Sequence, residues 1–466
     1  MKVYTSKYKN LLAMILLFAL ILGACQQQDG PEAPAEDDPA VEDGGQEGED
    51  PAEEPVGEAE ENREPVTLRF YQWAGQPHEG THQEVINAFM EEHPWITVRT
   101  EAVPFEEFFS GITAQAAAGN LPDVLAGDMP ETQHLAYNGL IQPLTPDVFS
   151  EEELEDFIPS TLREMTWDGQ LYGVTVRTSS NALFYNADML ADAGIEAPVT
   201  LDEGWTMEEA RDVWNTLTVR DSPDAPPEVF GVIGRRGNPF CLNSYHGVGY
   251  IRSAGEPGSP TYMGISEDGL SVDGHLNTPE ALEALQFCQE LHQVDRVAPL
   301  ELIPNGFETG LAATYEHPEN LIPVLDSTYP DINYGITPLP YFETGFSHTG
   351  SFAYFITRDT ENFEEAAMLV RWLVNEENTL LAFQQGQQLP ARKSILEQIT
   401  DYEEYPRRIF LDTLNEWGQP RPITPGFREY SQAVGTMLSD IMLGAPIEER
   451  VDQAVQEIDT ALSSYR

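Results

Sequence analysis

Lysine and cysteine are almost missing from this sequence of 466 residues. Beyond Lys9 the only lysine is Lys393, and the three cysteines are Cys25, Cys241 and Cys288. The formal net charge is −55 at pH 7, so the chain lacks the basic surface that nucleic-acid binding requires, and we expect no nucleic-acid partner. Arginine in place of lysine on a carboxylate-rich surface favours a saline or alkaline exterior, where arginine keeps its charge.

Familiar catalytic and metal-binding motifs are also missing. The sequence contains no Gly-x-Ser-x-Gly, no His-Glu-x-x-His, no phosphate-binding loop and no dinucleotide fingerprint. Its nine histidines are scattered without the spacing of zinc ligands. Paired carboxylates carry no information in a chain with 79 acidic residues. We therefore expect no metal, no cofactor and no enzymatic activity.

The N-terminus has the features of a secretory signal. Lys2, Lys7 and Lys9 precede an apolar run over residues 11–22, which is short for a membrane span of ~20 residues. Residues 22–25 then form a lipobox, so we predict a signal peptide over 1–25 and a lipid on Cys25. An uncleaved anchor, or an ordinary signal with an incidental cysteine, is the alternative. Each interpretation puts the remaining chain outside the cytoplasm, and the first anchors it to the outer face of the cytoplasmic membrane.

Residues 26–64 are predicted to be a disordered tether. They hold sixteen acidic side chains against the single Arg63, together with many Pro, Gly and Ala residues. Such a segment buries too little apolar surface to offset its ordering entropy, and like charges extend it. We interpret it as a spacer without a partner of its own.

The remaining 400 or so residues are enough for two domains. Apolar patterns predict strands at 66–73, 96–100 and 122–126, alternating with helices at 81–89 and 105–118. We expect the first helix to open on a capping box at Thr81. This alternation is typical of an α/β layer with a mainly parallel sheet, whose ligands lie beyond the carboxyl ends of the strands. Trp73 and Asp128 stand at those ends.

Downstream segments predict further helices and two turns. Capping residues and apolar spacing indicate helices starting near 206, 278, 362 and 446. Asp-Gly pairs at 268–269 and 273–274 predict hairpin turns. Cys241 and Cys288 form either a disulfide or a buried pair of free thiols, since Cys288 also fits the apolar face of its helix.

Several short motifs follow one another in a familiar order. They are Gly119-Asn-Leu-Pro-Asp-Val124, Leu171-Tyr-Gly-Val174, Leu183-Phe-Tyr-Asn-Ala-Asp-Met-Leu190, Phe307-Glu-Thr-Gly-Leu-Ala-Ala313, Tyr334-Gly-Ile-Thr-Pro-Leu-Pro340, Gly350-Ser351 and Leu389-Pro-Ala-Arg392. In this order they resemble the family 1 extracellular solute-binding proteins of ABC importers, which include maltose- and oligosaccharide-binding proteins. The resemblance covers residues 66 to about 462. The chain departs from the pattern at Thr175, at 204–206 and over 221–259.

The resemblance implies a two-lobed, type II periplasmic-binding-protein-like α/β fold, with a mainly parallel sheet in each lobe. Lobe I would comprise 65–177 plus 350–400, and lobe II 178–349 plus 401–466. The hinge between them would be crossed near 174–180, 341–351 and 399–405. Closure around a solute would be a hinge motion, which requires a solute-sized gap beside Trp73 and Asp128.

The resemblance also implies function and partners. The chain would capture a carbohydrate, in particular an oligosaccharide, and deliver it to the permease subunits of an ABC transporter, acting as a monomer. Alternatives are a binding protein for another solute, such as a peptide, a polyol phosphate or a uronate-type anion, and a secreted carbohydrate-active enzyme.

Sugars present apolar faces and many hydroxyl groups, so their sites combine aromatic rings with polar side chains that donate and accept hydrogen bonds. Trp73 is the candidate stacking platform, and Asp128 the candidate acceptor of hydroxyl hydrogen bonds. The other predicted ligand-binding residues lie at crossovers, strand ends and C-terminal loops: Arg177, Asn243, Tyr315, Glu316, Gly350, Ser351 and Trp417.

Overall fold

The structure is a computed structural model, and it describes residues 63–74, 79–242 and 244–466. The predicted signal peptide 1–25 with Cys25, nearly all of the tether 26–64, and Asn243 lie outside the described residues. Within these ranges, no helix combines the length and the apolar character that crossing a bilayer requires.

The first lobe is built on a four-stranded sheet with the order β11-β3-β1-β2. Its strands are β1 (Val66–Trp73), β2 (Ile96–Val103), β3 (Val124–Asp128) and β11 (Phe352–Ile356). β1 pairs in parallel with β2 and β3, whereas β11 runs antiparallel to β3. Because β1 is a central strand, its last four residues are buried on both faces.

The second lobe is built on a sheet with the order β7-β8-β6-β9. Its strands are β6 (Asn181–Asn186), β7 (Phe230–Ile233), β8 (Ala312–Pro318) and β9 (Tyr334–Thr337). Only β7 and β8 are parallel, because β6 runs antiparallel to both β8 and β9. The structure therefore differs here from the predicted mainly parallel sheet. β6 and β11 each follow a crossover from the other lobe, and each enters its sheet against the prevailing strand direction.

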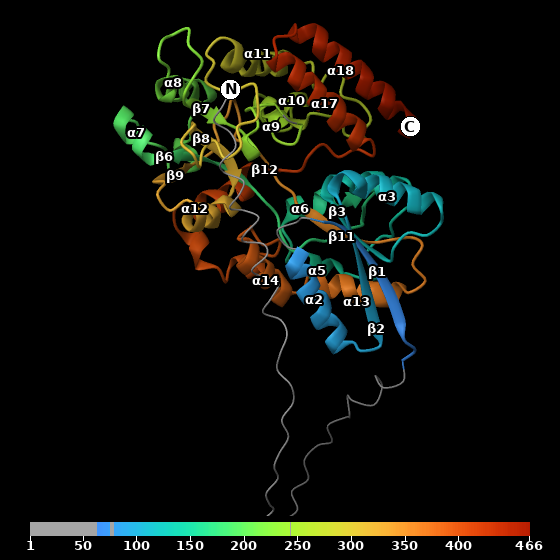
Figure 1. Cartoon of the computed structure of the whole chain (residues 1–466). Helices are drawn as coiled ribbons and strands as arrows, with labels where there is room; N and C mark the ends of the chain where they lie inside the picture. Colours follow the sequence, from blue (N-terminus) through green and yellow to red (C-terminus); the bar gives the residue numbers. More distant parts are fainter. Residues whose placement is uncertain (1–62, 75–78, 243) are drawn as a thin grey trace, which may run out of the picture. The chain divides into compact units, whose positions relative to one another are not determined.

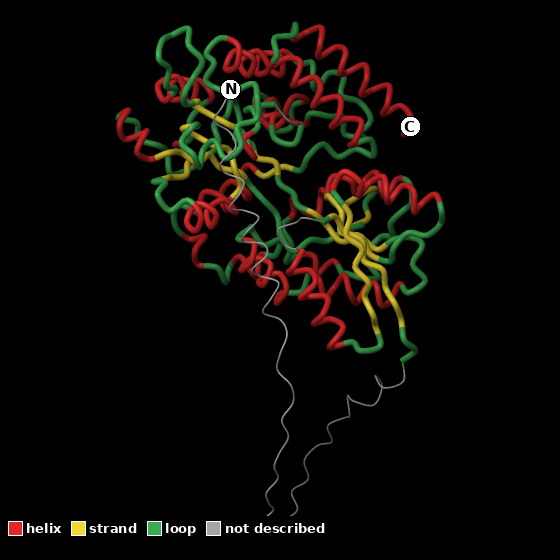
Figure 2. The backbone as a smooth tube through the Cα atoms, viewed as in Figure 1, coloured by secondary structure: helices red, strands yellow, loops and turns green. Residues whose placement is uncertain are grey.

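Helices surround both sheets (Figures 1 and 2). The helices before β6 are α2 (Glu79–Glu92), α3 (Phe105–Ala117), α4 (Thr132–Tyr137), α5 (Glu151–Leu154) and α6 (Pro159–Glu164). Three more come directly after β11: α13 (Phe363–Leu373), α14 (Glu376–Gly386) and α15 (Lys393–Leu396). The others are α7 (Ala187–Ala193), α8 (Met207–Leu217), α9 (Gly247–Ser253), α10 (Pro260–Met263), α11 (Pro279–Gln293), α12 (Ile322–Thr328), α16 (Arg407–Asp412), α17 (Phe427–Met442) and α18 (Ile447–Leu462). Short strands complete the fold: β4 (Thr166–Trp167), β5 (Gln170–Leu171), β10 (Ser347–His348) and β12 (Gly418–Gln419).

Separate hydrophobic cores stabilise the two lobes. One cluster of buried residues comes from 68–176 and 352–391 and packs around the first sheet. Two further clusters come mainly from 182–339 and 395–462 and pack on the two faces of the second sheet. Two chain segments run side by side between the lobes, where Thr178 donates its N–H to Leu389 (N–O 2.8 Å) and Ala391 donates to Val176 (3.0 Å). Residues 176–178 of the first predicted crossing are therefore hydrogen-bonded to residues 389–391.

Local signals in the sequence had mixed outcomes. Thr206 and Glu209 form the predicted capping box of α8, and Thr278 caps α11 before Pro279. The prediction for Thr81 is wrong, because α2 already begins at Glu79. The hairpin predicted at 268–274 is also wrong. Gly269 and Gly274 adopt positive φ as turn residues, but no strands flank them, since the segment packs by side-chain contacts to α18 instead.

The structure decides the open question about the cysteines in favour of a disulfide. Cys241 and Cys288 are bonded, with their Cα atoms 6.2 Å apart, and both are buried. Cys288 also lies on the buried face of α11, as its helical spacing indicated. The bond ties the loop before α9 to this long helix.

Loss of this disulfide is expected to lower the free energy of unfolding by about 2–4 kcal/mol, because the bond closes a loop of 47 residues in the unfolded chain. Denaturant titration with and without reductant measures the change. The double variant Cys241→Ala, Cys288→Ala is the control, and its unfolding should not respond to reductant. An equal response of both proteins would contradict a stabilising role for the bond.

Candidate functional site

The two lobes meet through polar side chains that follow strand and helix ends. Asp128 ends β3 of the first lobe, and the hydroxyl of Tyr245 in the second lobe donates to its Oδ2 at 2.8 Å. Two ion pairs also cross between the lobes: Arg421 Nη1 lies 3.3 Å from Glu164 Oε1, and Arg428 Nε lies 2.8 Å from Glu131 Oε2. We call these six residues the interlobe seam.

Aromatic rings cover the cations of the seam. The Arg421 guanidinium lies over the Tyr245 ring, 4.7 Å from its centroid, and the Arg428 guanidinium lies 4.3 Å from the ring centroid of Phe109. Glu164 is 1% exposed and Arg421 8% exposed, so this pair is almost fully withdrawn from water. A buried pair of this kind costs desolvation energy that its mutual attraction has to offset.

Burial dominates the ionisation of the seam carboxyls. It raises the pKa of Glu131 and of Glu164 to about 7, although the neighbouring arginines act in the opposite direction. Burial also raises the pKa of Asp128, against the effects of Arg421 and the Tyr245 hydroxyl. These carboxyl groups therefore hold protons at a pH where exposed ones have lost them.

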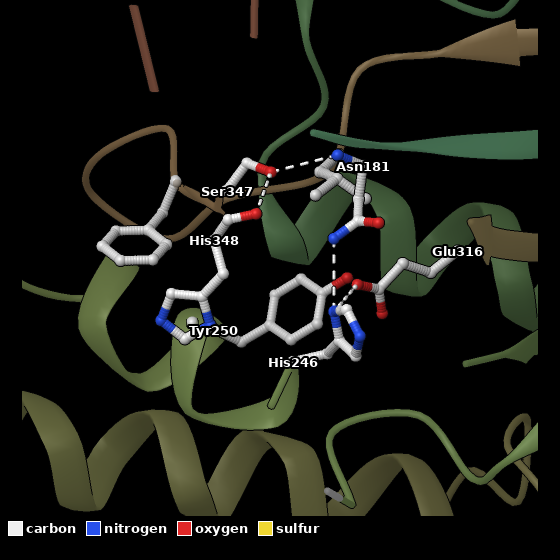
Figure 3. Close-up of a pocket in the computed structure, with 9 residues that line it drawn as sticks. Asn181, His246, Tyr250, Glu316, Ser347 and His348 are labelled. Carbon is white, nitrogen blue, oxygen red and sulfur yellow. Dashed lines mark hydrogen bonds and ion pairs between the residues drawn. The ribbon is translucent and has the colours of Figure 1, made fainter. Parts of the chain in front are cut away.

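A small polar cavity lies in the second lobe beside the seam (Figure 3). Asn181 Nδ2 lies 3.2 Å from His246 Nδ1, and Glu316 Oε1 lies 3.5 Å from the same nitrogen. Burial lowers the pKa of His246 well below its usual value, and burial raises the pKa of Glu316 to about 7. The cavity of about 10 Å³ has the space of about one water molecule.

The structure puts Tyr315 and Glu316 inside β8 (Ala312–Pro318), where they point to opposite faces of the sheet, and only Glu316 lines the cavity. The Tyr315 hydroxyl accepts a hydrogen bond from the backbone N–H of Arg236 (2.9 Å), and both side chains are buried. Arg177 lies apart from the cavity, in the first crossing. Its Nε donates to Ser351 Oγ at 3.1 Å and its guanidinium lies over Phe352, and burial lowers its pKa to about 9.

Trp73 does not present an open stacking surface in this arrangement. It is 7% exposed and packs edge-on against Phe108 and Phe352 within the core of the first lobe. The hollow that it lines with Gln72, His82, Ala126 and Phe352 has no room for a water molecule. Asp128 is likewise in contact with Tyr245 across the seam, so in the described part of the chain neither predicted residue presents an open surface to a solute.

Gly350 and Ser351 occupy the second crossing. The Gly350 carbonyl accepts from Ser179 Oγ at 2.8 Å, and the Ser351 N–H points to the sulfur of Met129 (3.0 Å). Trp417, in the π-helical turn Thr413–Trp417, is half-buried against Tyr341. Ser351 thus belongs with Arg177 at the crossings, whereas Trp417 lies apart from the seam residues.

Sequence reasoning missed most of the seam. Glu131, Glu164, Arg421 and Arg428 were not among the predicted site residues, because their partners lie hundreds of residues away along the chain. No local signal distinguishes them, since arginine is the common basic residue of this chain. Among the described residues, no group of three or more His, Cys, Asp or Glu side chains is arranged to hold a metal ion.

The larger hollows lie outside the seam. One of about 740 Å³ is lined by residues of α11 and the start of α18, and one of about 840 Å³ by residues around α5 and α13. Pockets that enclose a small molecule have volumes of roughly 300–1,000 Å³. Among the described residues the lobes are in contact at the seam, and neither of these two hollows lies between them.

Comparison with known proteins gives the family. Residues 84–408 match the family described as bacterial extracellular solute-binding protein. The chain belongs to this family of binding proteins, as its motifs predicted, and the family places it outside the cytoplasm.

Individual relatives are distant in sequence. The chain is 22% identical over 400 residues to a galactooligosaccharide-binding protein of Bacillus subtilis, a match that covers 82% of this chain and 87% of the relative. Among solved structures, an ABC substrate-binding protein of Listeria monocytogenes in complex with cycloalternan has a TM-score of 0.71 at 20% identity, covering 86% of this chain and all of that one. The GacH receptor of Streptomyces glaucescens has a TM-score of 0.70 at 17% identity, over 87% of this chain and all of that one. The predicted two-lobed fold is confirmed.

The raised carboxyl pKa values make stability depend on pH. Burial raises the pKa of Glu319, which is 1% exposed, from 4.5 to about 8. The folded chain then holds a proton that the unfolded chain has lost, so the free energy of unfolding falls as pH rises from about 4.5 to 8. We expect the melting temperature to fall by a few degrees between pH 6 and 9.

The variant Glu319→Gln, which mimics the protonated form, should reduce this fall in a thermal-shift series. Glu397→Gln removes an exposed carboxylate and is the matched control, with an expected fall like that of the unchanged chain. If Glu319→Gln and the control lose stability in parallel as pH rises, a protonated Glu319 is contradicted.

Proposed function

We propose that this chain is the extracytoplasmic solute-binding lipoprotein of an ABC importer, capturing a carbohydrate, in particular an oligosaccharide, and delivering it unaltered to the membrane permease. The family membership and the galactooligosaccharide-binding relative support a carbohydrate as the solute. An arabinooligosaccharide-binding relative from Halalkalibacterium halodurans, 22% identical over 248 residues, supports it as well. The lipid on Cys25 and the monomeric state are part of the proposal.

The observation that carries the proposal is the interlobe seam itself. Asp128 at the end of β3 contacts Tyr245, from the loop before α9, across the two lobes, and Glu316 of β8 lines the polar cavity beside them. Carboxylate, amide and imidazole groups of this kind can exchange their contacts with one another for contacts with sugar hydroxyls. Of the predicted residues, Asp128 and Glu316 lie at or beside this seam, and Arg177, Gly350 and Ser351 lie at the crossings.

Capture requires the seam to open and close about the crossings, which is a hinge motion. The lobe boundaries that we propose are 65–177 plus 350–400, and 178–349 plus 401–466. The first hydrophobic cluster, confined to 68–176 and 352–391, supports the boundaries near 177 and 350, whereas Ile395 and Ile399 pack in a cluster of the second lobe. The paired backbone segments 176–178 and 389–391 then form part of the hinge.

Calorimetric titration of the full chain with mono- and oligosaccharides tests the proposal. Binding of a sugar without appearance of shorter products supports capture without catalysis. Binding of peptides or polyol phosphates in place of sugars would support the alternative solutes, and release of hydrolysis products would support an enzyme.

Asp128→Ala is expected to weaken sugar binding by about 1.5–3 kcal/mol, the range for a hydrogen bond to a charged group. Asp452→Ala removes an exposed carboxylate on α18 and serves as the matched control, with unchanged affinity expected. Calorimetry on both variants, after circular dichroism confirms their folding, measures the difference. Equal affinities would remove Asp128 from the site.

Deletion of residues 26–64 is expected to leave sugar affinity unchanged, because a spacer contributes no contact to the solute. The comparison uses calorimetry on the full chain and on the shortened one, with the same sugar. A large loss of affinity in the shortened chain would contradict the interpretation as a tether.

A further inference from the structure

Arg235 stands at the carboxyl end of β7, beside the seam. It opens the turn η3 (Arg235–Gly237), which a set of hydrogen bonds holds in place. Gly234 donates its N–H to the Asn238 carbonyl (2.8 Å), and Asn238 Nδ2 donates to the Arg235 carbonyl (2.8 Å). The Arg236 N–H donates to Tyr315, although Arg236 has a φ of +61°, which is uncommon for a residue with a side chain. These hydrogen bonds therefore hold the backbone at Arg235 in one conformation before any ligand binds.

The guanidinium of Arg235 has no carboxylate partner in the described part of the chain. Its Nε is buried without a hydrogen bond, and its Nη1 lies 3.4 Å from His246 Nε2, which is a poor contact. Arg236 and Arg421 each repel it more than Glu316 attracts it. Arg235 is thus a cation without a close ion pair among the described residues, in a chain with a net charge of −55.

The seam carboxylates are already engaged. Glu164 pairs with Arg421, Glu131 pairs with Arg428, and Asp128 accepts from Tyr245. None of these three contacts includes Arg235, so no carboxylate of the described residues makes a close ion pair with its guanidinium.

Leaving a partly buried guanidinium unpaired costs free energy, and a bound anion removes that cost. A carboxylate can accept two parallel N–H bonds from Nε and one terminal nitrogen, which a sugar hydroxyl cannot do. A phosphate dianion fits less well, because one unpaired guanidinium does not balance two charges and Asp128 lies close enough to interact with Arg235.

We infer that the captured carbohydrate is acidic, with a uronic acid carboxylate bound by Arg235 at the seam. This inference rests on the proposed function and narrows its ligand class. Arg235 is then the residue that separates acidic sugars from neutral ones, because a neutral ligand leaves its charge unpaired.

Matched pairs of trisaccharides test the inference by calorimetry on the full chain. Each pair joins an acidic member, built from galacturonate, glucuronate or mannuronate, with its neutral counterpart, built from galactose, glucose or mannose. In at least one pair we expect the acidic member to bind at least tenfold more tightly, with an affinity that falls as salt rises.

Variants of Arg235 assign the contact. Arg235→Gln should lower the affinity for the acidic trisaccharide at least tenfold, and Arg235→Lys should lower it less, because an ammonium keeps the charge but loses the planar pair of donors. Arg408→Gln removes an exposed arginine on α16 and is the charge-matched control, with unchanged affinity expected. Thermal melts show whether each variant folds, and Arg235→Lys keeps the test informative if Arg235→Gln does not.

The outcomes separate the two claims. Neutral members that bind as tightly as acidic ones in every pair, or a preference for a hexose phosphate, overturn the inference and leave sugar capture standing. Acidic binding that Arg235→Gln does not weaken overturns the role of Arg235. No binding by any trisaccharide, neutral or acidic, contradicts the proposed function and the inference with it.

Discussion

The desolvation of charge governs how the two lobes meet. Glu164 and Arg421 are nearly free of water contact, and each depends on the other lobe for its partner. Contact between the lobes is therefore stabilised by polar pairs, each of which can be exchanged for water or for hydroxyl groups when the lobes part. An apolar interface would offer no such exchange. The seam thus suits a protein that has to close tightly and reopen.

Much of the fold follows from local patterns in the sequence. The strand over 66–73, the capping box at Thr206 and the proline start of α11 all agree with the structure. Each of these features depends on residues that are close together in the sequence, so a local sequence pattern is enough to predict it. The direction of β6 could not be obtained in this way, because it depends on a crossover from the other lobe. The turns at Gly269 and Gly274 were recognised, but their flanking residues pack on α18 and form no strands.

The site was less accessible from sequence. Trp73 was placed correctly at a strand end, yet its ring lies inside the core, because β1 is a central strand with helices on both faces. Asp128 was placed correctly at a strand end, whereas Glu316, expected after a strand, lies inside β8. The arginines of the seam were missed, because nothing local distinguishes Arg421 from an arginine on the surface. Their pairing depends on contacts between lobes, and only the folded chain shows these.

Gly350 connects the crossing segment to the seam. Its φ of +135° lies in the region that favours glycine, and a Cβ at this position would collide with the Arg421 guanidinium and press on the Glu164 carboxylate. The backbone of the second crossing therefore rests directly against the buried ion pair. A residue with a side chain at this position would keep the two lobes from closing fully. The residue at position 350 therefore limits how closely the lobes can approach each other.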